Sequence, residues 1–309
     1  MLVHRYQITA LLCGLLLSFA SQAAKLAIVI DDFGYRPTEE NKVLQMPQAI
    51  SVAVLPDAPY ARQMAIKAHQ GGREVLIHLP MAPLSKQPLE KNTLTPEMSR
   101  AEIDRIIRSA VNNVPYAVGL NNHMGSKMTS SLPGMQKVMQ ALNQYNLYFL
   151  DSMTIGNSQS LQAAQGTHVR VLKRRVFLDD SQDINAIRQQ FSRAVTLAQR
   201  DGYAIAIGHP HPNTVRVLQQ MLPSLPADIT LVTPGQLLNE PLRNGNGNGN
   251  GNASPAKITP HSKPLQGFLP PGECKVKQPL APVPASRALS VIGESITESP
   301  LYHRIDELF

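Results

Sequence analysis

The chain has 309 residues and a formal net charge of +7 at pH 7. Its basic residues are scattered and form no Lys/Arg block interleaved with aromatic residues, which argues against a nucleic-acid-binding protein. One of the two cysteines, Cys13, falls in an N-terminal segment that we expect to be removed, so Cys274 has no partner for an internal disulfide and the core alone must stabilise the fold.

The N-terminus has the pattern of a secretory signal peptide. A positively charged flank precedes an apolar run at residues 8–20, and Ser21 and Ala23 place small residues at a cleavage site. The run is shorter than the roughly 20 apolar residues that a membrane span needs. We therefore expect residues 1–23 to be removed and the remaining chain to be periplasmic with no transmembrane segment, a retained N-terminal anchor being the alternative.

Residues 24–243 are long enough for one α/β domain with a single core. Short, continuously apolar runs recur along this region, which is typical of parallel strands that are covered on both faces. The runs lie at residues 26–30, 50–55, 74–79, 116–120, 147–150, 204–207 and 229–232, and we expect residues 168–178 to hold one or two further strands. Amphipathic patterns typical of helices lie between them, at residues 58–70, 95–111, 132–145 and 183–200. We expect the second of these helices to begin with Thr95 as its N-cap and Pro96 in its first turn. This alternation predicts a (β/α) barrel of about seven strands, with a doubly wound sheet as the alternative.

The composition changes at Asn244. Residues 244–251 alternate Asn and Gly, and residues 253–309 are rich in Pro, Ser and Lys without any sustained periodicity. Such a composition cannot bury enough apolar surface to form a core. We expect residues 244–309 to be a low-complexity linker and a disordered tail without catalytic residues.

Polar side chains follow five of the predicted strands. They are Asp31 and Asp32, His78, the run Asn121, Asn122 and His123, Asp151, and the pair His209 and His211. Ligands of parallel α/β sheets bind beyond the carboxyl ends of the strands, so we expect these side chains to meet at one face of the barrel. Carboxylates and imidazoles gathered in this way can hold a metal ion, with further groups left to act as general base and general acid.

Five stretches, in this order, resemble the divergent polysaccharide deacetylases, a branch of the carbohydrate esterase family 4 superfamily. The stretches are IDDFG, EVLIHLPM, GLNNHMGS, FLDSMT and IGHPHP, and the resemblance covers residues 25–243. It implies a deacetylase-type (β/α) barrel and a hydrolase that removes N-acetyl groups from a polysaccharide or a cell-wall glycan such as peptidoglycan.

The resemblance also implies a metal centre, with Zn²⁺ as the expected ion. By similarity, Asp32 is the carboxylate ligand and His78 is the first histidine ligand. The second histidine of the better-understood deacetylases would lie four residues further on, where this chain has Ala82. His123, on the next strand, is the expected replacement.

The remaining roles are carried over in the same way. Asp31 is the expected general base, and His209 is the expected general acid. The residues expected to bind substrate or to support the site are Asn122, Ser126, Asp151 and His211. No counterpart of the arginine that orients the base in the better-understood deacetylases is evident.

Other interpretations of the same residues are open. The two aspartates could cap a helix, His78 could be a hydrogen-bonded core histidine, and Ser126 could be a turn residue. Two other functions are also open. One is a catalytically impaired deacetylase-fold protein that binds glycan or regulates cell-wall processing, which Ala82 and the missing arginine favour. The other is a metal-dependent amidase.

Overall fold

The computed structural model describes residues 23–239 of the chain. The predicted signal peptide, residues 1–23, lies outside this range except for its last residue, and the predicted linker and tail, residues 244–309, lie outside it entirely. Within residues 23–239, no helix combines the length and the apolar character that a membrane crossing needs.

Nine strands form one sheet in which every pairing is parallel. They are β1 (Ala24–Phe33), β2 (Ser51–Val54), β3 (Val75–Met81), β4 (Ala117–Met124), β5 (Tyr148–Asp151), β6 (Val171–Lys173), β7 (Val176–Phe177), β8 (Tyr203–Gly208) and β9 (Ile229–Val232). Eight of them follow the order β6-β5-β4-β3-β2-β1-β8-β7, and β9 pairs with the first part of β1. The prediction of a parallel (β/α) barrel is confirmed. The strands exceed the expected seven because residues 168–178 contribute two short strands.

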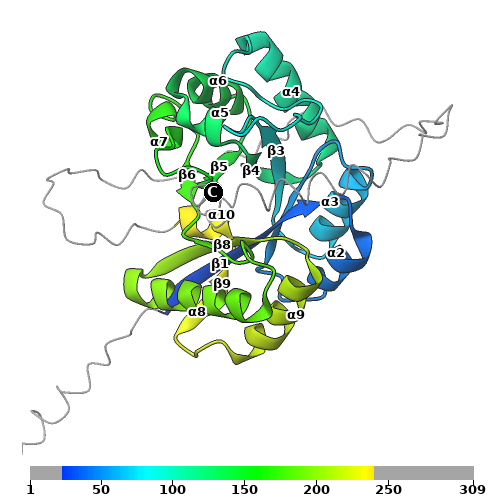
Figure 1. Cartoon of the computed structure of the whole chain (residues 1–309), viewed down its shortest axis with the longest axis vertical. Helices are drawn as coiled ribbons and strands as arrows, with labels where there is room; N and C mark the ends of the chain where they lie inside the picture. The colour runs from blue at the N-terminus through cyan, green and yellow to red at the C-terminus, as the bar shows by residue number, and fades with distance from the viewer. Residues whose placement is uncertain (1–22, 240–309) are drawn as a thin grey trace, which may run out of the picture.

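The helices form an outer ring around the strands (Figure 1). They are α2 (Pro37–Val43), α3 (Ala61–Gln70), α4 (Arg100–Asn113), α5 (Ser126–Ser130), α6 (Leu132–Leu142), α7 (Ser160–Ala163), α8 (Ile184–Asp201), α9 (Pro212–Met221) with the short 3₁₀ turn η1 (Leu222–Ser224), and α10 (Pro234–Leu238). Figure 1 shows α10 inside this ring, near the middle of the view. The sequence patterns predicted the long helices but not the short α2, α5, α7 and α10, nor α9.

The central strands β2, β3 and β5 are buried on both faces, as is most of β1, which explains why their runs are apolar throughout. In β1, Leu26, Ile28 and Ile30 belong to the large cluster under the helices, whereas Ala27 and Val29 belong to a small cluster inside the barrel. Successive side chains of a strand point to opposite faces, so both faces need apolar residues. Burying a side chain such as Ile28 stabilises the fold by about 1.5–3 kcal/mol.

The two ends of the sheet path are joined directly by the chain. β6 and β7 lie at opposite ends of the strand order, yet only Arg174 and Arg175 separate them in sequence. The backbone N–H of Arg174 donates to Asp151 O at 2.9 Å, and that of Arg175 donates to Ile205 O at 2.8 Å. The two arginines therefore cross the seam of the barrel, held to β5 on one side and to β8 on the other.

One predicted helix boundary was wrong. Helix α4 begins at Arg100, and its N-cap is Ser99 rather than Thr95. The Ser99 side chain accepts a hydrogen bond from the backbone of Glu102, whose carboxylate accepts one from the Ser99 backbone in return. This reciprocal capping box satisfies two backbone donors, which the Thr95-Pro96 pair does not do.

Candidate metal centre and active site

Asp31 and His78 occupy inward-facing positions within their strands, β1 and β3. The sequence pattern had placed these residues after the ends of the strands. In β1, Asp31 is the next inward position after Ala27 and Val29, and in β3 His78 follows Leu76. The inner face of the barrel is therefore apolar along most of its length and becomes ionisable only in the last residues of the strands. This arrangement places the site at the carboxyl-terminal end, where parallel α/β barrels bind ligands.

Strict alternation would turn Asp32 away from the site that Asp31 faces. The pairing of β1 with β2 shifts between Ile30 and Phe33, and Asp32 has a φ of 57°. This is the left-handed region, which aspartate adopts more readily than most residues but which remains uncommon. Because of this local distortion, both carboxylates reach the same end of the barrel.

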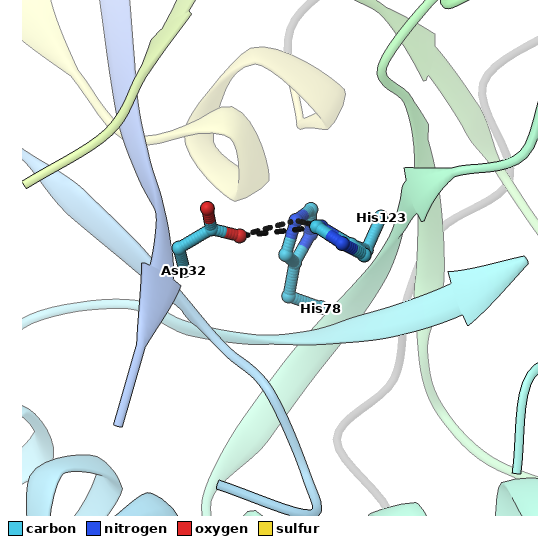
Figure 2. Close-up of side chains that lie close together, drawn as sticks. All are labelled: Asp32, His78 and His123. Carbon is cyan, nitrogen blue, oxygen red and sulfur yellow. Dashed lines mark hydrogen bonds and ion pairs between the residues drawn. The ribbon is translucent and has the colours of Figure 1, made fainter. Parts of the chain in front are cut away.

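Asp32, His78 and His123 meet at that end, as Figure 2 shows. Asp32 Oδ1 lies 3.3 Å from His78 Nε2 and 3.2 Å from His123 Nδ1, and the two ring nitrogens are 3.0 Å apart. Ligand atoms about 2.0–2.2 Å from a tetrahedral zinc ion stand roughly 3.3 Å from one another. Asp32 Oδ1 is buried and has no hydrogen-bond partner among the described residues. A buried oxygen without a hydrogen-bond partner, in a triangle of ligand atoms of this size, fits a site for a divalent cation.

The far nitrogen of His78 is fixed by Asn121. His78 Nδ1 and Asn121 Oδ1 are 2.9 Å apart, and the Asn121 amide donates to both oxygens of Asp31, at 2.8 and 3.0 Å. Since the amide nitrogen of Asn121 faces the carboxylate, the amide oxygen must accept a hydrogen bond that His78 Nδ1 donates. This hydrogen bond leaves the Nε2 lone pair of His78 free to bind a metal ion, as is usual for metal-binding histidines.

His123 faces a second carboxylate with its other nitrogen. His123 Nε2 lies 3.9 Å from Glu90 Oε1, and both atoms are buried without a hydrogen-bond partner in the described part of the chain. Burial opposes a charge on His123, but the attraction of Asp32 and Glu90 raises its pKa to about 9. Glu90 lies in the connection between β3 and α4, where no predicted strand or motif indicated it.

Asp31 lies beside this triangle and is fully enclosed. Its carboxylate is 3.6 Å from His78 Nδ1, and it accepts the two hydrogen bonds from Asn121. Burial raises the pKa of Asp31 above its ordinary value, although the neighbouring His78 and His209 counteract the effect. For Asp32, the attraction of His209 and His123 outweighs the penalty of burial and holds the pKa well below its ordinary value. The pKa values of the two neighbouring carboxyl groups are therefore shifted in opposite directions.

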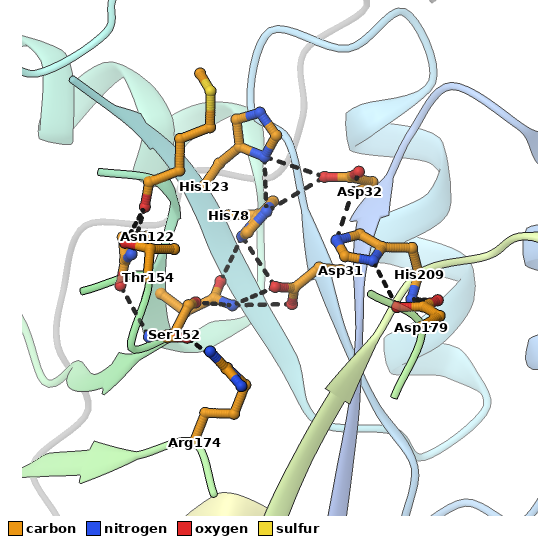
Figure 3. Close-up of polar contacts among 12 residues, drawn as sticks. Asp31, Asp32, His78, Asn122, His123, Ser152, Thr154, Arg174, Asp179 and His209 are labelled. Atoms are coloured by element: carbon orange, nitrogen blue, oxygen red, sulfur yellow. Dashed lines mark hydrogen bonds and ion pairs between the residues drawn. The ribbon is translucent and has the colours of Figure 1, made fainter. Parts of the chain in front are cut away.

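His209 enters the same space from the end of β8, as Figure 3 shows. Its Nδ1 lies 3.0 Å from Asp179 Oδ1, and its Nε2 lies 3.8 Å from Asp32 Oδ2. Asp179 Oδ2 accepts hydrogen bonds from the backbone N–H of His209 and from the Thr214 hydroxyl, both at 2.7 Å. Burial alone would lower the pKa of His209, but the attraction of Asp179 and Asp32 raises it to about 10. The imidazole is thus held in one orientation and carries a proton at neutral pH.

His211 differs from His209 in its charge. Arg36 Nη1 lies 3.1 Å from His211 Nδ1, and burial lowers the pKa of His211. An arginine can only donate, so His211 Nδ1 must be an acceptor and the ring is neutral, with its proton on Nε2. Asp179, His209 and His211 lie close enough to suggest a second metal site. However, both oxygens of Asp179 already accept hydrogen bonds and His211 Nδ1 accepts one from Arg36, so these atoms are engaged within the protein.

Two predicted supporting residues have other partners. The Asp151 carboxylate accepts hydrogen bonds from the backbone of Met153 and from the hydroxyls of Ser158 and Ser160. Asp151 therefore fixes the loop after β5, which borders the site, and does not face the cavity itself. Ser126 accepts a hydrogen bond from the backbone N–H of Leu84 and is not brought to the cavity, which fits the alternative interpretation of a turn residue.

Asn122 lies at the cavity wall. Its amide donates to Met124 O, and its oxygen accepts a hydrogen bond from the backbone N–H of Ser152 at 2.9 Å. It therefore joins the end of β4 to the loop after β5. The side chain shapes the wall, and its polar atoms are engaged within the protein.

A cavity of about 340 Å³ opens over these residues. It is lined by Asp31, His78, Asn122, His123 and His209 and by side chains that the sequence analysis did not select, among them Arg174, Phe177 and Arg193. Asp179 was also missed, although it directly follows the predicted strand segment 168–178 and the rule of polar residues after strands could have found it. Burial lowers the pKa of Arg174 to about 10, although the attraction of Asp31 counteracts this effect.

Comparisons with known proteins identify the family and support the fold. A family model described as divergent polysaccharide deacetylase matches residues 28–238. The chain is 64% identical over 301 residues to the uncharacterized protein YibQ of Escherichia coli K12, covering 97% of this chain and 92% of that protein. It is 46% identical over 220 residues to an uncharacterized protein of Haemophilus influenzae Rd, covering 71% of this chain and 79% of that protein. The crystal structure of an uncharacterized protein from Agrobacterium tumefaciens C58 matches with a TM-score of 0.65 and 18% identity, over 71% of this chain and 90% of that chain, and bears on the fold alone.

Proposed function

The chain belongs to the divergent polysaccharide deacetylase family, and on this basis we propose that it is an exported, metal-dependent hydrolase that removes N-acetyl groups from a polysaccharide or cell-wall glycan. The family match and the barrel support a deacetylase-like protein. Export to the periplasm rests on the signal-peptide pattern of residues 1–23. The observation that carries the catalytic part is the triangle of Asp32, His78 and His123, in which Asp32 Oδ1 has no hydrogen-bond partner among the described residues.

We assign a divalent cation to this triangle, with Zn²⁺ as the expected ion. One carboxylate and two imidazoles are a common ligand set for catalytic zinc, which keeps a further position open for water. When bound, such an ion lowers the pKa of a water molecule and polarises the carbonyl oxygen of the acetyl group. Asn121 supports the assignment because it leaves His78 Nε2 unprotonated.

Asp31 is the proposed general base. A base must be an ionised acceptor within reach of the attacking water, with a pKa high enough to hold the proton. Asp31 is adjacent to the triangle, its orientation is fixed by the two hydrogen bonds from Asn121, and burial raises its pKa. It accepts the proton of the water as the water attacks the acetyl carbonyl carbon.

His209 is the proposed general acid. Its Nδ1 is bound to Asp179, so its Nε2 carries the proton that faces the site. The amine that leaves when the amide bond breaks needs this proton. Asp179 is a positioning residue because it acts through His209, holding the ring in place and favouring its protonated form.

Metal analysis and acetate release test the proposal. The purified mature chain should contain a divalent metal and release acetate from chitooligosaccharides or cell-wall fragments, and a chelator should abolish the release until the metal is restored. Asp32→Ala and His123→Ala should each lose metal and acetate release. His168→Ala is the control because His168 is exposed at the other end of the barrel, and this variant should keep both. Undiminished acetate release in either site variant would contradict the proposed centre.

The same assays separate the two other functions. Ala82 stands where a second histidine ligand was expected, and this observation favours a glycan-binding or regulatory protein that has lost turnover. Bound metal and bound glycan without any product would support that function. Release of an amine from peptide-bearing wall fragments without acetate would support a metal-dependent amidase.

A further inference from the structure

Three arginines line the cavity, and the proposed reaction uses none of them. Arg174 and Arg175 come from the seam between β6 and β7, and Arg193 comes from α8. The three residues, which we call the arginine wall, line the same cavity as Asp31 and His209. Their backbone positions are fixed by the barrel itself, because the two seam residues are hydrogen-bonded to β5 and β8.

Arg174 is held in place with a hydrogen-bond donor to spare. Its Nε donates to Ser152 O and its Nη2 donates to Met153 O at 2.8 Å, as the contact to Ser152 in Figure 3 illustrates. The guanidinium carbon lies 4.8 Å from the centre of the Phe177 ring. Nη1 has no hydrogen-bond partner among residues 23–239. A guanidinium oriented by three contacts is preorganised to bind an anion with its remaining edge.

The other two arginines are only partly neutralised. Arg193 is exposed, and its hydrogen bond within the described chain is a long one, 3.4 Å, to Gln190 Oε1. Arg175 Nη2 forms an ion pair with Asp201 Oδ2 at 2.6 Å, and the same carboxylate also forms an ion pair with Arg200. Among the residues that line the cavity, these three arginines stand against two carboxylates, Asp31 and Asp180, both of which attract Arg174, as does Asp151. The cavity lining therefore has one more arginine than it has carboxylates.

The arginine wall lies close to the proposed general acid. The Phe177 ring stands between them, with its centre 5.2 Å from that of the His209 ring and 4.8 Å from the Arg174 guanidinium carbon. The imidazole and the guanidinium can be no further apart than these two distances together. A sugar whose acetamido group lies at His209 would thus bring its own substituents, or those of the next sugar, to the arginine wall.

We propose that the arginine wall is a subsite for a carboxylate of the glycan, so that the preferred substrate is an acidic N-acetylated glycan. The proposal rests on the proposed deacetylase function and narrows its substrate class. Arginine matches a carboxylate because its planar fork donates two parallel hydrogen bonds. The carboxylate has two chemical sources, a uronic acid or a lactyl ether on the sugar.

Binding measurements on three oligosaccharides of equal length test this subsite. A hyaluronan oligosaccharide carries a uronic-acid carboxylate, a muramic-acid-containing glycan carries a lactyl carboxylate, and a chitooligosaccharide carries no carboxylate. Calorimetry on the metal-loaded chain should give a dissociation constant about 10-fold lower for at least one acidic glycan than for the chitooligosaccharide. The acidic glycan that binds more tightly identifies the source of the carboxylate.

A matched pair of variants on α8 isolates the charge. Arg193→Met should weaken binding of the acidic glycan by about 3- to 10-fold and leave the chitooligosaccharide unaffected. Arg188→Met removes an exposed arginine of the same helix that bonds Gln220 and does not line the cavity, so it should change neither.

Each result decides between the subsite and the reaction. Equal affinities for acidic and neutral glycans, equal effects of the two variants, or no binding of any glycan would overturn the subsite. Preferential binding of an acidic glycan without acetate release would keep the subsite and contradict the deacetylase. Acetate release from acidic and neutral glycans with equal kcat/KM would keep the deacetylase and overturn the subsite.

Discussion

At the amino-terminal end of the barrel, the carboxylate of Glu74 joins three parts of the chain. Its Oε1 accepts hydrogen bonds from the Tyr148 hydroxyl at 2.6 Å and from the Gly235 backbone at 3.0 Å, and its Oε2 accepts one from Thr233 at 2.7 Å. At the carboxyl-terminal end, Asp32 also reaches into the barrel, but its Oδ1 has no hydrogen-bond partner within residues 23–239.

The difference separates a structural polar cluster from a candidate ligand site. A buried polar atom without a partner costs free energy, so most native polar groups are paired. At the Glu74 end, the polar groups of the cluster are paired with one another. Their hydrogen bonds hold the start of α10 at this end of the barrel. At the Asp32 end, the unpaired oxygen and the unpaired nitrogen of His123 lie within one small group of residues. This contrast argues that the residues at the Asp32 end are arranged to bind a ligand.

The strongest test of this contrast is the removal of the proposed acid. His209→Gln should lower acetate release by roughly 10²–10⁴-fold, because the leaving amine loses its proton donor. The variant should keep its metal, since His209 is not one of the three proposed ligands. The measurement is kcat for acetate release with metal content determined in parallel. His168→Gln, at the Glu74 end, serves as the control and should retain wild-type activity. An equal loss of acetate release in the two variants would contradict the assignment of catalysis to the Asp32 end alone.

A smaller effect is expected at Glu90, which faces His123 from behind. Glu90→Gln should weaken metal binding by roughly 10- to 100-fold, because a carboxylate behind a metal-binding histidine raises its basicity and fixes its orientation. The dissociation constant of the metal, measured by competition with a chelator of known affinity, checks this. Glu97→Gln is the matched control because Glu97 is exposed on the same connection. Unchanged metal affinity in Glu90→Gln would show that the 3.9 Å approach of Glu90 to His123 has no role at the centre.

The Glu74 end should respond in stability and not in activity. Tyr148→Phe removes the hydrogen bond to Glu74 and should lower the free energy of unfolding by about 1–2 kcal/mol. Urea unfolding measures this loss, and acetate release should stay at the wild-type level. Tyr116→Phe is the control because Tyr116 is exposed. A loss of activity in folded Tyr148→Phe would show that the two ends are coupled.

Much of the architecture could be predicted from the sequence because its signals are local. A strand buried on both faces must be apolar throughout, and such runs marked seven strands of the sheet, whereas the short β6 and β7 fell within the mixed segment 168–178. The gathering of Asp32, His78 and His123 followed from the rule that the carboxyl ends of parallel strands meet at one edge. The assignment of chemical roles to these residues stays a prediction.

The remaining features depend on tertiary structure that no local pattern reveals. Thr214, which donates a hydrogen bond to Asp179, lies 35 residues further along the chain, and no local pattern links the two. Glu90 reaches His123 from a connection without regular structure, so its position depends on the packing of the whole domain. The positive φ of Asp32 turns its side chain toward the site against the alternation of the strand, and nothing in the Asp31-Asp32 pair itself indicates this turn.

The smallest expected effect lies in the acid stability of the Asp179 pair. Burial would raise the pKa of Asp179, but the attraction of His209 and its hydrogen bonds outweigh burial and lower the pKa. A carboxyl group whose pKa is lower in the folded than in the unfolded state stabilises the fold above its unfolded pKa, about 3.9, and loses this contribution as the pH falls through the folded value. The free energy of unfolding of the metal-free chain should therefore fall more steeply below about pH 4 than that of Asp179→Asn. Urea unfolding of both chains across the acid range, in the presence of a chelator, measures the two slopes. Parallel curves would mean that Asp179 has the same pKa in the folded and unfolded chain, and that the ion pair with His209 does not stabilise the fold.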